Sequence, residues 1–504
     1  MTPATSQDEA VKETTGLPDV LDLDSVRIDP SWALRIPASL ALRKRILPLC
    51  AIDGVVHAAC LDVEDTASRQ AISTATGCEV VLVEADPESL RHALNRIYWG
   101  ASKPGSTAAS RRLDAEEEDA AALCDEILTA ALLRDASDIH LLPTETSLQV
   151  QFRVDGQLEL FRELPMDAHG SLISRLKVLS GLDIAEKRSP QDGRFNTHVG
   201  PQRQKMDMRV ATLPTRFGER MTLRVLALKT GSITLESLGM NARCLEQFRE
   251  AIYRPHGMIL LTGPTGSGKS TTLFAAITEL LAQRGGNVIT VEDPIEYDMS
   301  GVSQVEVDSA DKVSFGKALR SILRHDPDVV MIGEIRDGET ADIAAKASLT
   351  GHLVFSTLHT NTAAGVVTRL RDMGIEKFLV AATLRLAIAQ RLCRRLCPHC
   401  RKPRDMEATE AMALGRPELA GQTIYEPGGC VYCAGRGFNG RIAMFEMLGI
   451  DNETAQLIGS DADEADLIAA ARKRETPLLI DDAIEKLTNG VTSLSEVTGA
   501  VVEF

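Results

Sequence analysis

The residues best suited to chemistry lie in segment 263–270, which reads Gly-Pro-Thr-Gly-Ser-Gly-Lys-Ser and fits the pattern G-x-x-x-x-G-K-[ST]. An apolar run precedes it and a helix-like stretch, 271–282, follows it. Glycines let successive backbone N–H groups converge, and with the next helix N-terminus they attract phosphate oxygens. Lys269 would neutralise the β- and γ-phosphates, and the Ser270 hydroxyl would ligate Mg²⁺. The segment predicts a nucleotide site; the alternative is a chance glycine-rich turn. The expected nucleotide-binding residues are Gly263, Pro264, Thr265, Gly266, Ser267, Gly268, Lys269, Ser270 and Thr271.

Acidic residues follow two further predicted strands. Glu334 comes just after the apolar segment 329–332, at a carboxyl strand end, where ligands bind in open α/β sheets. A carboxylate there can orient or deprotonate the attacking water. Glu292 and Glu296 follow the predicted strand 287–291 and are candidates to hold Mg²⁺ or the water. The alternatives are a solvated strand-end glutamate and a surface turn.

Two histidines flank the predicted strand 353–357. His359 stands at the carboxyl end of this strand, on the nucleotide side, where it could sense or bridge the γ-phosphate. His352 stands at the opposite end, and geometry gives it no clear role. A lone histidine is more often structural than catalytic.

Arginines are expected near a phosphoryl-transfer site, because its charge needs further neutralisation. Arg209 and Arg224 occupy strand-like positions in the region before the phosphate loop. Their residue chemistry alone favours ordinary surface ion pairs.

Four of the ten cysteines form two C-x-x-C pairs, Cys397 with Cys400 and Cys430 with Cys433. In a reducing compartment such pairs hold Zn²⁺ tetrahedrally, and four thiolates leave no position for water. We therefore expect a structural zinc site; the alternative is redox-active or incidental pairs. The other six are expected to be small buried hydrophobes: Cys50, Cys60, Cys78, Cys124, Cys244 and Cys393.

Composition and length limit the choice of function. The 504 residues are too many for one core, and 44% hydrophobic with 25% charged residues is typical of folded cytosolic proteins. A formal net charge of -16 argues against general nucleic-acid binding. No apolar run is long enough to cross a bilayer, so we expect a cytoplasmic protein.

Turn-rich and charged stretches divide the chain into expected parts. In order they are a flexible leader (1–28), an N-terminal α/β domain (29–99), a linker (100–118), a second N-terminal domain (119–232), a phosphate-loop domain (233–395), a tetracysteine insert (396–441) and a C-terminal helical part (442–504).

Together these motifs resemble the secretion ATPase superfamily that powers type II secretion and type IV pilus assembly. The resemblance covers most of the chain. It rests on the phosphate loop, the acidic box 291–296, the strand end at Glu334 and the histidine box 350–361, in the order and spacing of the family. The implied fold class is α/β: a RecA-like P-loop ATPase core, a preceding α+β (PAS-like) domain, a small N-terminal α/β domain and the tetracysteine zinc insert.

The resemblance also assigns roles. Glu334 becomes the catalytic glutamate, Glu292 and Glu296 belong to the aspartate box, and His352 and His359 to the histidine box. Arg209 and Arg224 match arginines that approach the phosphates from the preceding domain. ATP, Mg²⁺ and Zn²⁺ are the implied cofactors. The implied assembly is a homohexamer, peripheral to the inner membrane through platform proteins, with no nucleic-acid partner.

The expected function is therefore a cytoplasmic ATPase that powers type II secretion by driving pseudopilus assembly. A type IV pilus assembly ATPase shares nearly every motif and is the nearest alternative. Two further hypotheses are an ATP-binding zinc scaffold without productive turnover and a nucleic-acid motor. The acidic charge balance weakens the motor hypothesis, although a basic pore can lie inside an acidic protein.

Overall fold

The computed structural model describes residues 20–98, 112–199, 204–226, 233–307, 314–460, 462–474 and 476–501. The chain forms two compact units. The first unit comprises residues 1–228, 396–402 and 426–439, and the second comprises 229–395, 403–425 and 440–504. Within the described residues, no helix combines the length and apolar character needed to cross a bilayer.

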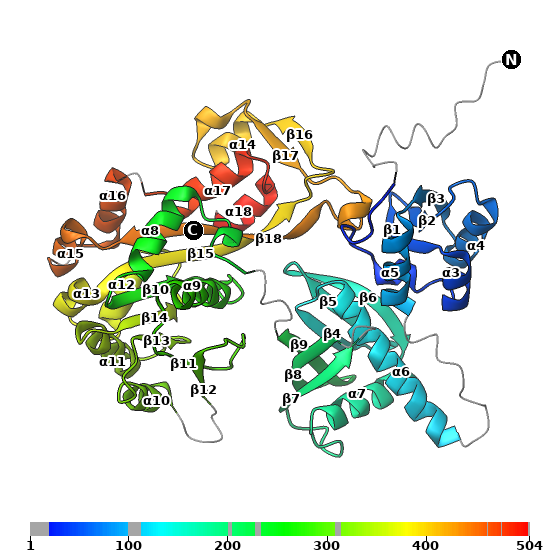
Figure 1. Ribbon diagram of the computed structural model, residues 1–504, viewed down its shortest axis with the longest axis horizontal. Coiled ribbons are helices and arrows are strands. Elements are labelled where there is room, and N and C mark those ends of the chain that lie inside the picture. The colour runs from blue at the N-terminus through cyan, green and yellow to red at the C-terminus, as the bar shows by residue number, and fades with distance from the viewer. Residues whose placement is uncertain are drawn as a thin grey trace. The chain divides into compact units, whose positions relative to one another are not determined.

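The second unit is built on a seven-stranded sheet with the order β12-β11-β13-β14-β10-β15-β18 (Figure 1). Five neighbouring pairs in it run parallel: β10 with β14 and β15, β11 with β12 and β13, and β13 with β14. The strands are β10 (Gly257–Thr262), β11 (Val288–Glu292), β12 (Val302–Glu306), β13 (Val329–Ile332), β14 (Leu353–Leu358), β15 (Leu384–Leu396) and β18 (Phe438–Gly449). Parallel pairing brings the carboxyl ends of β10, β13 and β14 to one edge, where the predicted site residues follow.

Helices cover both faces of this sheet, because alternate residues of a strand point to opposite sides. Met258 and Leu260 of β10 belong to the core under helices α10 to α13, whereas Ile259 and Leu261 belong to the core under α8 and α9. All six residues of β10 are buried, as expected for a strand covered twice. The helices are α8 (Ala242–Ile252), α9 (Lys269–Arg284), α10 (Phe315–Ile322), α11 (Gly338–Leu349), α12 (Gly365–Asp372) and α13 (Lys377–Thr383), after the short η2 (Glu236–Leu238).

The C-terminal region departs from the predicted helical part. Residues 442–449 continue the long strand β18, which packs Phe445 and Met447 into the core under α8 and α9. Residues 403–425, expected within the zinc insert, instead belong to the second unit, where Met406 and Ile424 share a core with the C-terminal helices. The remaining elements here are β16 (Lys402–Asp405), α14 (Ala408–Ala413), η3 (Pro417–Leu419), β17 (Thr423–Glu426), α15 (Asn452–Gly459), α16 (Glu464–Lys473), α17 (Leu479–Thr488) and α18 (Leu494–Val501).

The first unit begins with a small three-stranded sheet, in which β2 pairs antiparallel with β1 and parallel with β3. Its start differs from the expected leader: Leu21 and Leu23 are fully buried, and Leu21 bridges to Ala85. These apolar side chains complete the core beside the three strands. In the sequence they stand among polar residues, so no apolar run predicts their burial. Residues 1–19 of the expected leader and most of the linker lie outside the described residues. The elements are α2 (Pro30–Ala33), α3 (Ala38–Lys44), β1 (Leu47–Ile52), β2 (Val55–Cys60), α4 (Thr66–Thr76), β3 (Glu79–Glu84) and α5 (Pro87–Tyr98).

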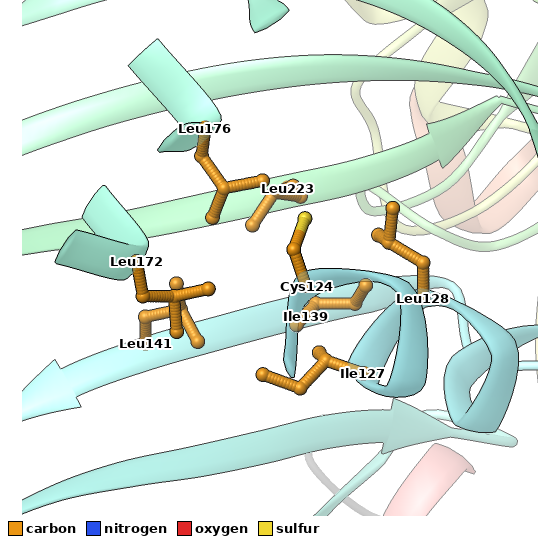
Figure 2. Close-up of a pocket in the computed structure, with 8 residues that line it drawn as sticks. All are labelled: Cys124, Ile127, Leu128, Ile139, Leu141, Leu172, Leu176 and Leu223. Atoms are coloured by element: carbon orange, nitrogen blue, oxygen red, sulfur yellow. The ribbon is translucent and has the colours of Figure 1, made fainter. Parts of the chain in front are cut away.

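A six-stranded antiparallel sheet follows, with the order β6-β5-β4-β9-β8-β7. Helices α6 and α7 pack against it, and Figure 2 shows Cys124 of α6 and Leu176 of α7 facing Ile139 of β4 and Leu223 of β9 around a small apolar cavity. Helix α6 begins at Arg112, inside the expected linker. The elements are α6 (Arg112–Leu133), β4 (Asp138–Pro143), β5 (Ser147–Val154), β6 (Gln157–Pro165), α7 (Asp167–Leu179), β7 (Gln191–Val199), β8 (Gln204–Thr215) and β9 (Gly218–Leu226).

Candidate nucleotide site and metal centre

The phosphate loop joins β10 to α9 and is shaped by glycines in conformations that other residues avoid. Gly263, Gly266 and Gly268 have φ angles of 144°, 79° and 87°. A Cβ on Gly263 would lie 2.4 Å from the backbone oxygen of Gln390, so only glycine fits there. The buried Ser267 Oγ has no hydrogen-bond partner among the described residues. An unpartnered hydroxyl inside a glycine-lined loop at a helix N-terminus fits a bound phosphate.

Lys269 is held inside this loop. Its Nζ donates to the backbone oxygens of Gly263 at 2.7 Å and Pro264 at 3.1 Å, and only 9% of the residue is exposed. Burial lowers the pKa of Lys269, and nearby Glu334 opposes that shift. A desolvated ammonium held by two carbonyls is ready to exchange them for the more negative oxygens of a phosphate. Ser270, the expected magnesium ligand, is exposed beside it.

Glu334 follows β13 at the same edge of the sheet. One carboxylate oxygen accepts a short hydrogen bond from Arg336, and the other lies 3.2 Å from Nε2 of His359. Burial raises the pKa of Glu334, but the hydrogen bonds from Arg336 and His359 outweigh it, so the pKa lies below its ordinary value. The group is therefore ionised at neutral pH, as a water-positioning residue or base must be.

The acidic box after β11 contributes two different groups. Glu292 is buried and accepts from Oγ1 of Thr290 at 2.6 Å and from Nε2 of Gln304 at 3.0 Å. Burial raises the pKa of Glu292. Glu296 is exposed, and its negative charge raises the pKa of Lys269. Next to it, Tyr297 makes a 2.8 Å hydrogen bond to Thr271, which ties the box to the first turn of α9.

The structure brings only one of the two predicted histidines to the site. His359 follows β14 and contacts Glu334. His352 precedes β14, where its ring nitrogen Nδ1 lies 3.0 Å from the oxygen of Ala347. The six residues of β14 between them span about 20 Å. His352 therefore stands at the edge opposite the phosphate loop, where its contact fixes the end of α11.

The structure also reveals site residues that the sequence reasoning missed. Gln390 and Arg391 lie on β15, beside β10, although more than a hundred residues separate them from the phosphate loop. Oε1 of Gln390 accepts from Oγ1 of Thr272 at 2.9 Å, and Arg391 donates to the backbone oxygen of Asn361 at 3.2 Å. Both side chains are buried by partners that are distant in the sequence, so no local sequence pattern marks them.

A second missed pair joins the loop to the histidine box. The backbone N–H of Thr360 donates to Oγ1 of Thr262 at 2.6 Å, and the two hydroxyls lie 2.8 Å apart. Thr262 is the last residue of β10 and Thr360 follows His359. These contacts hold the carboxyl ends of β10 and β14 together. They therefore fix the positions of the phosphate loop and His359 relative to each other.

The two predicted arginines belong to the first unit. Arg209 and Arg224 are directly opposite each other on β8 and β9, and both are exposed. Nε of Arg224 donates to Asp138 at 3.0 Å. Their approach to the phosphates stays a prediction.

The four predicted cysteines converge. Their sulfur atoms all lie within 4.8 Å of one another, and three of the four residues are buried. The Cys397–Cys430 and Cys400–Cys433 sulfur pairs are each 3.7 Å apart. A tetrahedral Zn²⁺ with Zn–S bonds of about 2.3 Å requires sulfurs about 3.8 Å apart, so the cluster fits zinc. The N–H of Gly437 donates to Sγ of Cys433 at 3.2 Å, a contact that would help to orient and stabilise a metal-bound thiolate. Of the other six cysteines, Cys78 is partly exposed and five are buried.

Two family models match the chain. The type II/IV secretion system protein model matches residues 114–499, and the MshEN domain model matches residues 16–103. The second match includes the buried residues before position 29, in agreement with the packed start of the first unit.

Curated relatives match at high identity. Type II secretion system protein E of Aeromonas hydrophila is 47% identical over 375 residues, 74% of this chain and 74% of that protein. Type II secretion system protein E of Pseudomonas aeruginosa is 41% identical and aligns over 92% of this chain and 95% of its own length. The type IV pilus assembly ATPase PilB of Myxococcus xanthus is 38% identical and aligns over 96% of this chain and 89% of its own length.

A solved structure agrees with the fold of the ATPase core. The pilus retraction motor PilT with bound ADP aligns with 74% of this chain and 96% of its own, at a TM-score of 0.52 and 28% identity. The expected family and fold class are thereby confirmed. With a family model spanning residues 114–499 and relatives at these identities, the chain belongs to the type II/IV secretion system protein family and is a P-loop ATP hydrolase.

Proposed function

We propose that Glu334 activates the water that attacks the γ-phosphate of ATP. The supporting observation is its position: an ionised carboxylate at the end of β13, across the sheet edge from Lys269. Lys269 would leave the carbonyls of Gly263 and Pro264 and neutralise the phosphates. Ser270 would hold Mg²⁺, which would supply charge neutralisation. His359 would keep Glu334 oriented, and buried Glu292, with exposed Glu296, would support the site from the acidic box.

We further propose that hydrolysis powers type II secretion by driving pseudopilus assembly at the inner membrane. Support comes from the relatives named type II secretion system protein E, at 47% identity in Aeromonas hydrophila and over 92% of this chain in Pseudomonas aeruginosa. In this proposal the protein is a homohexamer in the cytoplasm, recruited by platform proteins. Arg209 and Arg224 would complete the site from the domain that precedes the core, and the tetracysteine cluster would hold structural Zn²⁺.

Type IV pilus assembly is the second candidate. It is favoured by the PilB relative of Myxococcus xanthus, which matches 96% of this chain. The expected domain boundaries stay proposals, with three revisions. The N-terminal domain takes in Leu21 and Leu23, the second N-terminal domain starts at Arg112, where α6 begins, and residues 403–425 are grouped with the C-terminal part.

Complementation separates the two candidates. In a strain lacking this gene, wild-type protein should restore release of exported proteins to the medium, and Glu334→Gln should not. An exposed control, Lys346→Gln, on α11 and 64% exposed, should restore release fully. Restored pilus extension with no effect on release would overturn the type II assignment and favour the pilus candidate.

A further inference from the structure

A second cavity in the ATPase unit lies at the edge of the sheet opposite the phosphate loop. It has a volume of about 400 Å³, within the range of small-molecule sites. Its lining includes Arg254, His256 and Arg385, which come from the segment before β10 and the start of β15. Because β10 runs for six residues between this cavity and the phosphate loop, the two are about 20 Å apart. We call it the amino-edge cavity.

Its positive charge is not balanced by protein carboxylates. Among the described residues, neither Arg254 nor Arg385 has an ion-pair partner. The one acidic residue in the lining, Asp451, is already engaged: Oδ2 pairs with Arg474 at 2.7 Å, and Oδ1 accepts from the N–H of Thr454 at 2.9 Å. Desolvating a guanidinium beside another positive charge is unfavourable unless an anion completes the site.

The position of Arg385 depends on a glycine in the neighbouring strand. Its side chain lies across Gly257, where an added Cβ would come within 2.3 Å of Cγ of Arg385. Gly257 also has a φ of 133°, which other residues rarely adopt. Arg385 is half-buried, and burial together with the nearby Arg254 lowers its pKa. The fold therefore makes room for a charged side chain that its own residues do not neutralise.

We propose that the amino-edge cavity binds a small molecule carrying two or more phosphate groups. Planar guanidiniums match phosphate oxygens in a bidentate manner, and two of them with a histidine favour more than one anionic group. The volume exceeds what a single phosphate fills, and Ile450 and Ala455 offer an apolar wall for the rest of the ligand. The site is separate from ATP hydrolysis and does not depend on which secretion machine the protein serves.

The test uses the full chain with its phosphate loop occupied by saturating ADP in magnesium-free buffer, and inorganic pyrophosphate as the probe in a calorimetric titration. Wild-type protein should bind one pyrophosphate per chain. Arg254→Gln combined with Arg385→Gln should weaken this binding by about tenfold or more, because two charge-assisted contacts are lost. ADP affinity should stay unchanged, which also shows that the variant is folded.

Charge-matched and isosteric variants sharpen the result. Arg320→Gln combined with Lys346→Gln removes two exposed charges of the same unit outside the cavity, and pyrophosphate affinity should match the wild type. Asn452→Asp adds a negative charge to the lining without changing its shape and should weaken binding. This exposed position keeps the test informative should the double arginine variant fail to fold.

Two results would overturn the proposal. One is the absence of pyrophosphate binding to ADP-saturated wild type, or binding that survives in the double arginine variant. The other is an assembly of the chain that depends on Arg254 and Arg385 while pyrophosphate does not bind, because the occupant would then be an acidic surface of a second copy.

Discussion

At the scale of single residues, the proposed mechanism rests on contacts of Glu334 and Lys269 that a substrate would replace. The lysine is held by two loop carbonyls, and the glutamate by Arg336 and His359. Each contact is one that a nucleotide and its attacking water can replace. Preorganised groups of this kind contribute to catalysis because they need little rearrangement at the moment of reaction.

The lowered pKa of Glu334 predicts how stability depends on pH. Burial raises the pKa of Glu334, but Arg336 and His359 lower it by a larger amount. The folded pKa therefore lies below that of an unfolded glutamate, about 4.3. The stabilisation from ionised Glu334 is then complete above that pH and is lost as pH falls through the folded pKa. Urea unfolding of wild type and Glu334→Gln from pH 7 to 3 should show a constant gap down to about pH 4.3 that then narrows. A gap that widens as pH falls would contradict the contacts.

Gly263 tests the shape of the phosphate loop. Gly263→Ala would place a Cβ 2.4 Å from the oxygen of Gln390, at a φ of 144°, and should lower the free energy of unfolding by about 2 to 3 kcal/mol. Gly266→Ala is the matched control, since its φ is also positive but nothing lies within 4 Å, and should cost about 1 kcal/mol. Equal losses in thermal or urea unfolding would show that Gln390 does not approach the loop.

At the scale of elements, the sequence predicts a strand best where an uninterrupted apolar run marks it. The uninterrupted apolar run of β13 was predicted at the bounds the structure has, 329–332. Strand β15 was missed, because its apolar residues alternate irregularly with Gln390, Arg391 and Arg394. Those polar groups are accommodated by distant partners, such as Thr272 for Gln390 and Glu496 for Arg394. Burial of this kind depends on tertiary neighbours and has no local pattern.

The site follows the same division. The phosphate loop, Glu334 and the cysteines were predictable because a motif carries their geometry in its spacing. The sequence already places His359 at the carboxyl end of a strand and His352 at its opposite end, and the six buried residues of β14 separate the two in the structure. Only the family resemblance adds His352 to the site. A strand's two ends lie at opposite edges of the sheet, so histidines at the two ends of β14 face different edges.

A buried ion pair joins the C-terminal helices to the sheet. Nζ of Lys486 lies 2.6 Å from both carboxylate oxygens of Asp482, and one of these also accepts from the N–H of Phe445 on β18 at 2.8 Å. Lys486→Met should cost about 3 to 5 kcal/mol, since it leaves a buried carboxylate unpaired. Lys486→Met combined with Asp482→Leu should recover part of this loss. Additive losses of the two single variants in urea unfolding would contradict the pairing.

At the scale of the whole molecule, the segment that carries the tetracysteine cluster also packs against other parts of the first unit. Val431, between two of the cysteines, is 1% exposed within the core of the N-terminal domain. Nη2 of Arg436 lies 3.0 Å from Glu159 of β6. A short segment near the end of the chain thus contacts both N-terminal domains, and its metal would fix that contact.

Metal content and proteolysis test this role. The wild type should carry about one zinc per chain, as four thiolates imply, and Cys430→Ser should lose most of it. Loss of metal should also speed proteolysis within residues 20–98, since Val431 would no longer be held in that core. Cys78→Ser, at a partly exposed cysteine outside the cluster, should behave as wild type. Equal, near-zero zinc in wild type and Cys430→Ser would remove the metal assignment.

The most direct test of the central claim compares ATP binding with ATP turnover in two variants of the full chain. If Glu334 positions the attacking water, Glu334→Gln should bind ATP as the wild type does while turnover falls by about a thousandfold, and Lys269→Ala should lose binding as well. Turnover by Glu334→Gln within a few fold of the wild type would contradict the account.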